Sequence, residues 1–197
     1  MDLGLQGRKA IVCASSRGLG KACAMELAAA GCDLVVNGRD EQVTNATADE
    51  IRKTHGVKVT VVLGDVSAKA TQDALLAACP EPDILINNNG GPPPKGFRDL
   101  TREAIAEGVA QNMATPIELI QRVVDGMAAR KFGRIVNITS SSVKAPIVGL
   151  DLSSGARAGL TAFLAAPARE VAHANVTINN IMPGMFDTDR LRGTTGR

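Results

Sequence analysis

The 197-residue sequence contains no tryptophan and no tyrosine, and its only aromatic residues are four phenylalanines. Without tyrosine, the chain has no phenol that can serve as a proton donor. No apolar stretch approaches the roughly 20 residues that a membrane helix needs. The first nine residues, MDLGLQGRK, lack the charged and apolar regions of a signal peptide. We therefore expect a cytoplasmic protein without a membrane partner.

The sequence also lacks a strong charge imbalance and a metal-binding cysteine pattern. Its net charge is +2, which gives no electrostatic reason to expect a nucleic-acid partner. The four cysteines, Cys13, Cys23, Cys32 and Cys79, have no metal-ligand or CxxC spacing, so no metal site is expected. Three of them fall in strand or helix patterns, as buried reduced thiols do. The length and the hydrophobic content of 45% predict one globular domain spanning residues 1–197.

Apolar, strand-like runs alternate with helical patterns along the chain. We expect strands near residues 9–14, 33–37, 57–63, 83–87, 133–139 and 176–182. We expect helices at 18–30, 40–55, 68–79 and 153–173, and a long helical region that breaks near Gly108 and Thr115-Pro116 and ends by about Arg130. This alternation predicts an α/β fold with a doubly wound parallel sheet of the Rossmann type. Its ligand crevice would lie at the carboxyl ends of the strands.

The stretch from Arg8 to Gly31 predicts an anion site. An apolar strand leads into a loop of small residues, and a helix follows with Gly31 as its predicted C-cap. The free N–H groups and the positive dipole end at a helix N-terminus favour an anion there. Glycine allows a phosphate to come close, because it has no Cβ. Taken alone, the pattern also fits an ordinary strand–loop–helix unit.

Several motifs occur together in an order typical of one family. They are the loop Ser15-Ser16-Arg17-Gly18-Leu19-Gly20, the pair Asp65-Val66, the run Asn87-Asn88-Asn89-Gly90, Asn112, the strand 133–138 followed by Thr139-Ser140, and Pro183-Gly184 with Thr188. Along essentially its whole length the chain resembles the short-chain dehydrogenases/reductases. Within that family it is nearest in style to 3-oxoacyl-acyl-carrier-protein reductases.

The resemblance implies a nicotinamide cofactor and a set of residues that bind it. The loop Ser15-Ser16-Arg17-Gly18-Leu19-Gly20 would hold the phosphates, and Asp65-Val66 would lie against the adenine ring. Asn89 and Gly90 belong to a cofactor-binding motif, and Pro183-Gly184 with Thr188 would cover the nicotinamide. The catalytic positions would be Asn112, Ser140, Ser153 and Arg157, of which Arg157 would also contact the nicotinamide ribose. The implied partners are a small-molecule or acyl-thioester substrate and further copies of the chain in a dimer or tetramer.

Two departures from the family pattern affect its chemistry. The family's Tyr-x-x-x-Lys should begin thirteen residues after Ser140, where this chain has Ser153, and Arg157 stands in the lysine position. A serine hydroxyl is far less acidic than a phenol, and an arginine stays charged. Losing a positioned acid is typically worth about 10²–10⁴ in rate, so the pattern permits a slow enzyme.

Other departures concern the loops. Ala14 stands where the family usually has glycine, and an alanine fits poorly if that position needs a positive φ. Asn89 replaces the alanine of the family's NNAG motif. Family members normally continue with a substrate lid and a seventh strand, which we expect this chain to lack or not to show. Pro167 lies inside the helix predicted at 153–173, where it would cost about 3 kcal/mol unless a kink absorbs it.

Substitute proton donors and other interpretations stay open at this point. Lys144 and Asp151 lie in the loop before Ser153, where a solvated charge competes with a catalytic role. His173 fits a structural role at a helix end, and His55 lies well before the site motifs. Ser140 also fits a turn-forming hydroxyl. Asn112 also fits a polar residue at a helix break.

The second strand ends at Asn37-Gly38-Arg39, where NAD-preferring relatives place an acidic residue. Asp40 lies past that strand, where it fits a helix cap. Arg17 and Arg39 favour a 2′-phosphate, so we expect NADP(H) rather than NAD(H), although Ala14 leaves cofactor binding itself open.

The leading hypothesis is an NADP(H)-dependent reductase of a ketone or a 3-oxoacyl substrate. A non-catalytic nucleotide-binding or regulatory protein on the same scaffold is the alternative. A third possibility is altered chemistry in which Arg157 holds an anionic substrate.

Overall fold

The computed structural model describes residues 2–189, 191 and 192 of the chain. These residues form two compact units. The first unit contains the residues up to Asn88 together with those from Met185 onward, and the second contains Asn89–Gly184. Each unit is described by itself.

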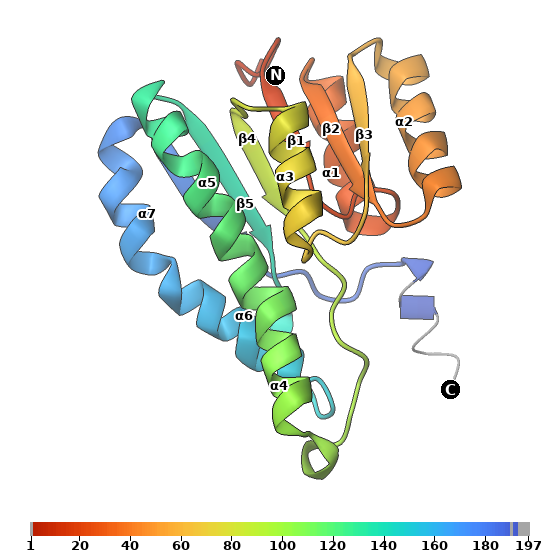
Figure 1. Cartoon of the computed structure of the whole chain (residues 1–197), viewed down its shortest axis with the longest axis vertical. Coiled ribbons are helices and arrows are strands. Elements are labelled where there is room, and N and C mark those ends of the chain that lie inside the picture. The colour runs from red at the N-terminus through yellow and green to blue at the C-terminus, as the bar shows by residue number, and fades with distance from the viewer. Residues whose placement is uncertain (1, 190, 193–197) are drawn as a thin grey trace. The chain divides into compact units, whose positions relative to one another are not determined.

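Strands alternate with helices along the first unit: β1 (Lys9–Val12), α1 (Gly18–Ala29), β2 (Asp33–Gly38), α2 (Glu41–His55), β3 (Val59–Leu63), α3 (Lys69–Ala78) and β4 (Ile84–Asn87). Parallel pairing places β1 between β2 and β4, with Ile11 opposite both Val35 and Leu85. Figure 1 shows α3 in front of these strands and α1 behind them. The α1 face made by Gly20, Ala24 and Ala28 is buried, since small residues four apart let a helix pack closely.

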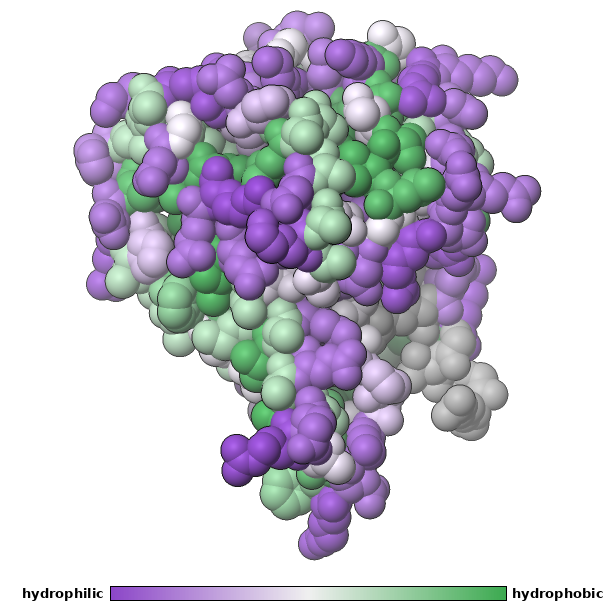
Figure 2. All heavy atoms as spheres, viewed as in Figure 1, coloured by the Kyte–Doolittle hydropathy of each residue, from purple (hydrophilic) through white to green (hydrophobic). Residues whose placement is uncertain are grey.

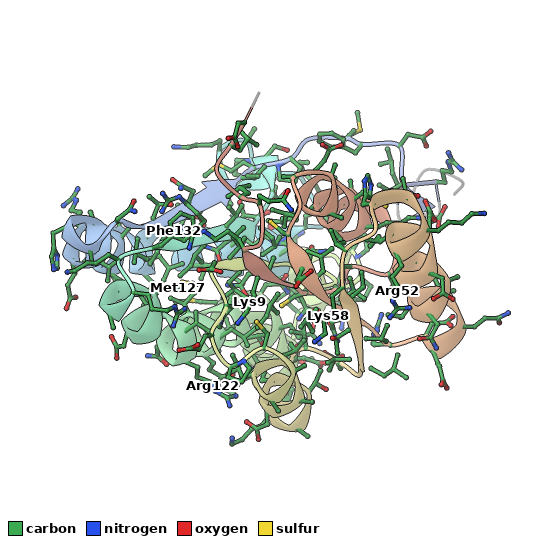
Figure 3. The ribbon with its side chains drawn as sticks, turned by 90° about the horizontal axis from the view of Figure 1, so that it is seen from above. Lys9, Arg52, Lys58, Arg122, Met127 and Phe132 are labelled. Atoms are coloured by element: carbon green, nitrogen blue, oxygen red, sulfur yellow. The ribbon has the colours of Figure 1, made fainter. Side chains whose placement is uncertain are left out.

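The second unit contains α4 (Arg102–Val109), a π-helical turn η2 (Ala110–Ala114), α5 (Thr115–Ala129), β5 (Gly133–Ile138), α6 (Asp151–Phe163), α7 (Ala165–Val171) and β6 (Val176–Ile181). It also has short 3₁₀ turns η1 (Phe97–Asp99), η3 (Ser141–Val143) and η4 (Ala172–Ala174). β5 pairs with β6 in parallel, from Gly133 opposite Val176 to Ile138 opposite Ile181. Of the residues labelled in Figure 3, Met127 lies near the end of α5 and Phe132 lies in the connection from α5 to β5. A Cβ on Gly133 would lie only 2.7 Å from Sδ of Met127.

The strands follow the order β3-β2-β1-β4-β5-β6, and each described pairing is parallel. This is the doubly wound order of the Rossmann type, so the predicted fold class is confirmed. The predicted strands agree with the observed ones to within two residues at each end. Their core side chains, such as Ile11, Val36, Leu85 and Ile135, are fully buried.

The long helical region continues through its predicted break without a loop. Figure 1 shows α4 and α5 as one column, and η2 joins them. Pro116 has no N–H, so the carbonyl of Asn112 loses the hydrogen bond that an α-helix would give it. The hydroxyl of Thr115 donates to the carbonyl of Ala110 at 2.9 Å, which supports the widened turn.

Two predictions about helix ends were wrong in detail. The helix predicted at 153–173 is divided at Leu164 into α6 and α7. Pro167 therefore lies in the first turn of α7, where its missing N–H breaks no helical hydrogen bond and the predicted cost does not arise. At the end of α1, Ala30 is the C-cap, and Gly31 follows it with φ of +83°.

Hydrophilic side chains are spread over much of the face shown in Figure 2. No helix in the described part of the chain combines the length and the apolar character needed to cross a membrane. All four cysteines are free. Cys13 and Cys79 are buried as predicted, whereas Cys23 is only half-buried and Cys32, which lies outside the predicted strands and helices, is buried.

Ala14 has φ of +44°, so the position after β1 does need the left-handed region. An L-residue there costs about 1–2 kcal/mol, while glycine adopts the same backbone without that penalty. The loop keeps this conformation because its neighbours fix it. The N–H of Ala14 donates to Oδ1 of Asn37 at 3.0 Å, and its carbonyl accepts from Nδ2 of Asn88 at 3.1 Å.

We predict that Ala14→Gly raises the free energy of unfolding by about 0.5–1 kcal/mol, because relief of the backbone strain outweighs the added freedom of the unfolded chain. Urea unfolding followed by circular dichroism measures this change. As a matched control, Ala22→Gly on the exposed side of α1 should lower stability by about 1 kcal/mol. A lower stability of Ala14→Gly would contradict the strain argument.

Candidate functional site

In the first unit, the buried side chain of Asn37 connects β2 to the loop after β1, to β3 and to the loop after β3. Its Oδ1 accepts from the N–H of Ala14, and its Nδ2 donates to the carbonyls of Val62 and Gly64 at 3.1 Å each. All three of these hydrogen bonds join the side chain to main-chain groups. The sequence had pointed to Asn37 only as the residue found in place of an acidic one, so this bracing role was missed. The signal was a polar residue inside an otherwise apolar strand.

The hydroxyl of Ser15 has a structural role. It donates to the carbonyl of Val12 at 2.7 Å and accepts from the N–H of Asn37 at 3.0 Å, and the residue is fully buried. These two hydrogen bonds hold the start of the predicted phosphate loop against β1 and β2. That Ser15 also contributes to cofactor binding stays a prediction.

The rest of the loop leaves the N-terminus of α1 open to a ligand. Arg17 is the N-cap, its side chain makes no capping hydrogen bond, and the first turn of α1 contains no acidic residue. Gly18 is exposed with φ of +57°. A Cβ on Gly20 would overlap with the carbonyl oxygen of Ala14 and lie 2.9 Å from Nδ2 of Asn88. Asn88, which the predicted site did not include, therefore braces the loop against β4.

Two exposed arginines stand beside this helix terminus. Nη2 of Arg17 lies 3.6 Å from Oδ2 of Asp40, and Nη1 of Arg39 lies 4.0 Å from Oδ2 of Asp65. The predicted capping role of Asp40 is confirmed, because its Oδ1 accepts from the N–H of Val43 at 3.1 Å. Because the cap uses only Oδ1, the second carboxylate oxygen of Asp40 is left to pair with Arg17.

The remaining predicted residues of the first unit lie close to the same loops. Leu19 is half-buried in the first turn of α1, and Val66 is buried after β3. A Cβ on Gly18 would lie 3.6 Å from Cγ2 of Thr188, so Thr188 stands against the phosphate loop. The structure thus places Thr188, which was predicted to cover the nicotinamide, against the loop predicted to hold the phosphates.

In the second unit, Ser140 stands where β5 gives way to η3. Its Oγ accepts from the N–H of Ser142 at 3.1 Å and from the hydroxyl of Ser142 at 2.9 Å. Both lone pairs of the Ser140 hydroxyl are then used, which leaves its own proton to donate. The next N–H, that of Ser141, donates to the carbonyl of Pro183 at 2.9 Å. Ser140 and the predicted nicotinamide-covering segment therefore adjoin.

Ser153 and Arg157 are buried on one face of α6, four residues apart. Nη1 of Arg157 lies 3.5 Å from Oγ of Ser153 and 3.4 Å from the carbonyl of Thr139. The guanidinium thus links the serine that replaces the expected proton donor to the residue preceding Ser140. A buried cation beside Ser153 can attract an anion or a developing negative charge.

Asn112 is buried in the π-helical turn. Its Nδ2 lies 3.4 Å from the carbonyl of Gly108, while its Oδ1 has no hydrogen-bond partner among the described residues. The carbonyl of Gln111 accepts from Nδ2 of Asn89 at 3.1 Å, and Oδ1 of Asn89 accepts from the N–H of Gly90. Asn89, Gly90 and Asn112 are therefore brought together. A catalytic role for Asn112 stays a prediction.

The charged groups weighed as substitute acids have ordinary surface positions. Lys144 and Asp151 are exposed, which favours a solvated charge for each. His173 is exposed too, with Nδ1 2.8 Å from the carbonyl of Glu170. Burial raises the pKa of the Cys13 thiol to about 12, so this cysteine stays protonated and unreactive at neutral pH.

The donors present in the first unit fit a dinucleotide phosphate. The N-terminus of α1 offers main-chain N–H groups without a side-chain cap, a Cβ at Gly20 would fill the loop, and Arg17 and Arg39 are exposed cations. In the described part of the chain, no three His, Cys, Asp or Glu side chains gather as metal ligands would.

Comparisons with known proteins identify the family of this chain. Residues 8–195 match the family model described as short chain dehydrogenase. A 3-oxoacyl-[acyl-carrier-protein] reductase of Aquifex aeolicus (strain VF5) is 32% identical over 193 residues, which cover 96% of this chain and 78% of the relative.

Two solved structures extend the agreement to the fold. L-sorbose reductase from Gluconobacter frateurii, complexed with NADPH and L-sorbose, is 27% identical with a TM-score of 0.92, over 98% of this chain and 75% of that one. A 3-oxoacyl (acyl-carrier-protein) reductase from Agrobacterium tumefaciens C58 with NADP bound is 30% identical with a TM-score of 0.89, over 98% and 75% of the two chains. By its sequence and its fold, the chain belongs to the short-chain dehydrogenase family.

Proposed function

We propose that the chain is a slow, NADP(H)-dependent reductase of a ketone or a 3-oxoacyl substrate. One observation carries the proposal: the uncapped N-terminus of α1 lies in the same unit as two exposed arginines, Arg17 and Arg39. The reductases similar to this chain support the reaction class, and two of them are described with NADPH or NADP bound.

The cofactor would be held by main-chain and charged groups of the first unit. The N–H groups at the start of α1 would bind the pyrophosphate. Arg17 and Arg39 would bind the 2′-phosphate, since a guanidinium matches phosphate geometry. When bound, the cofactor supplies a hydride to the carbonyl carbon of the substrate.

Ser140 is the group best prepared to hold the substrate carbonyl. Its hydroxyl proton is left to donate because Ser142 supplies hydrogen bonds to its oxygen. A donor fixed in this way stabilises the negative charge that develops on the carbonyl oxygen during reduction. This requires no change in the ionisation of Ser140.

Ser153 and Arg157 explain why the reaction would be slow. The hydroxyl of Ser153 is a poor acid, and the Arg157 guanidinium keeps its proton at ordinary pH. Arg157 would still stabilise negative charge on the substrate oxygen, while the proton would have to come from Ser153 or from water. The expected loss relative to a phenolic acid is about 10²–10⁴ in rate.

A non-catalytic nucleotide-binding protein is the second candidate. The observation that favours it is the replacement of both proton-transfer residues, with Ser153 accepting a hydrogen bond from Arg157. Such a protein would bind the dinucleotide through the first unit and catalyse no reduction.

We predict that the chain binds NADPH at least about tenfold more tightly than NADH, because Arg17 and Arg39 meet the added phosphate. Isothermal titration calorimetry with each dinucleotide measures the ratio. Equal affinities would contradict the NADP(H) preference. Absence of binding to either would contradict both candidate functions.

We further predict that the double substitution Ser153→Tyr with Arg157→Lys raises kcat for NADPH-dependent reduction of an acetoacetyl thioester by about 10²-fold. It supplies a phenol whose pKa a nearby ammonium group lowers toward neutrality. The rate is followed by the loss of NADPH absorbance.

The matched control is Ser153→Phe with Arg157→Lys, which has the same ring and cation but no hydroxyl. It should not exceed the unmodified chain. Circular dichroism and NADPH binding establish that each variant is folded. If the tyrosine variant folds and binds NADPH but is no faster than the phenylalanine variant, the reductase proposal is wrong and the non-catalytic candidate is favoured.

A further inference from the structure

Asp40 and Asp65 share one arrangement in the first unit. Oδ1 of Asp40 accepts from the N–H of Val43 at 3.1 Å, while Oδ2 lies 3.6 Å from Nη2 of Arg17. Oδ1 of Asp65 accepts from the N–H of Ser67 at 2.8 Å, while Oδ2 lies 4.0 Å from Nη1 of Arg39. Each carboxylate is therefore fixed to its own main chain by one oxygen and faces an arginine with the other.

Both ion pairs belong to loops that meet at Gly38. A Cβ on Gly38 would lie 2.8 Å from Cβ of Ser16, so the loop before α1 packs directly on the end of β2. The carbonyl of Gly38 accepts from the N–H of Gly64 at 2.9 Å, which brings in the loop that carries Asp65. Thr47 of α2 donates to the carbonyl of Ser16 at 2.8 Å. The backbone around both pairs is consequently well fixed.

The ion pairs themselves are weak. The side chains of Arg17 and Asp40 are 52% and 54% exposed, and those of Arg39 and Asp65 are 79% and 45% exposed. Exposed ion pairs at such distances contribute little to stability, so a bound phosphate can replace the carboxylates as the partner of the arginines. The arginine side chains can turn toward a phosphate, but the carboxylates stay where the main chain holds them. Their negative charge then remains close to the incoming phosphate.

We propose that Asp40 is a specificity-determining residue that limits the preference of this chain for NADP(H) over NAD(H). Asp65 limits the same preference through its ion pair with Arg39. The inference rests on the proposed function, since it assumes that the dinucleotide binds at α1. The anchored carboxylate of Asp40 competes for Arg17 and repels a 2′-phosphate. A ribose 2′-hydroxyl carries no charge and is not repelled.

The test is Asp40→Asn in the full chain. Asparagine keeps the size of the side chain and an oxygen that accepts from Val43, so the cap of α2 is retained while the charge is removed. Calorimetry with NADPH and with adenosine 2′,5′-bisphosphate should show binding tighter by about three- to tenfold, the effect of one exposed charge on a nearby phosphate. Binding of NADH and AMP should change by less than about twofold, and the gain should shrink in high salt.

Asp49→Asn is the matched control. Asp49 is exposed on the same helix and pairs with Arg52 at 2.6 Å, so the substitution removes the same charge away from Arg17. It should leave the ratio of NADPH to NADH affinity unchanged. Arg52, labelled in Figure 3, also donates to the carbonyl of Val59, which keeps it engaged.

The outcomes separate this inference from the proposed function. If the unmodified chain binds neither NADPH nor adenosine 2′,5′-bisphosphate, both are overturned. If it prefers NADPH but Asp40→Asn leaves the ratio unchanged or lowers it, only the role of Asp40 is overturned. The same holds if Asp49→Asn shifts the ratio by as much as Asp40→Asn does.

Discussion

The hydrogen bonds of the buried Asn37 side chain are the interaction on which the first unit of the structure depends. One side chain joins the loop after β1, the end of β2 and the strand and loop at β3 through three hydrogen bonds. An unpaired amide in that position would be costly, so the three main-chain segments and the side chain constrain one another. The strained conformation of Ala14 persists within this set of bonds, because its N–H is one of the groups that Asn37 fixes.

The fold was predictable from the sequence because its strands are continuous apolar runs. Ile11, Val36 and Leu85 are fully buried or nearly so on paired parallel strands, and such runs have few other stable arrangements. The break near Pro116 was predictable from its missing N–H, but its form as a π-helical turn was not. The division of the last helix at Leu164 was missed, since Pro167 indicates a disturbance without showing on which side of it the helix ends.

The site was predictable to a different degree in each unit. The sequence predicted a phosphate loop at residues 15–20 from its glycines, and the structure adds that a Cβ on Gly20 would overlap with the carbonyl oxygen of Ala14. The bracing roles of Asn37 and Asn88 and the ion pair of Arg17 with Asp40 were not predictable, because they join residues distant in sequence. In the second unit, sequence could place Ser153 and Arg157 on one helical face. It could not show that Ser142 satisfies the oxygen of Ser140 and leaves its proton to donate.

We therefore propose that this chain binds a nicotinamide dinucleotide but lacks fast proton transfer. The reduction is then slow and depends on no acid of the site that titrates near neutral pH. The most direct measurement is the single-turnover rate of NADPH oxidation with excess acetoacetyl thioester as a function of pH. We expect a slow rate that stays flat from about pH 6 to pH 9, because neither a serine nor an arginine ionises in that range. A rate that falls through a pKa within that range would contradict it by revealing a titrating acid, and no turnover at any pH would contradict the reductase itself.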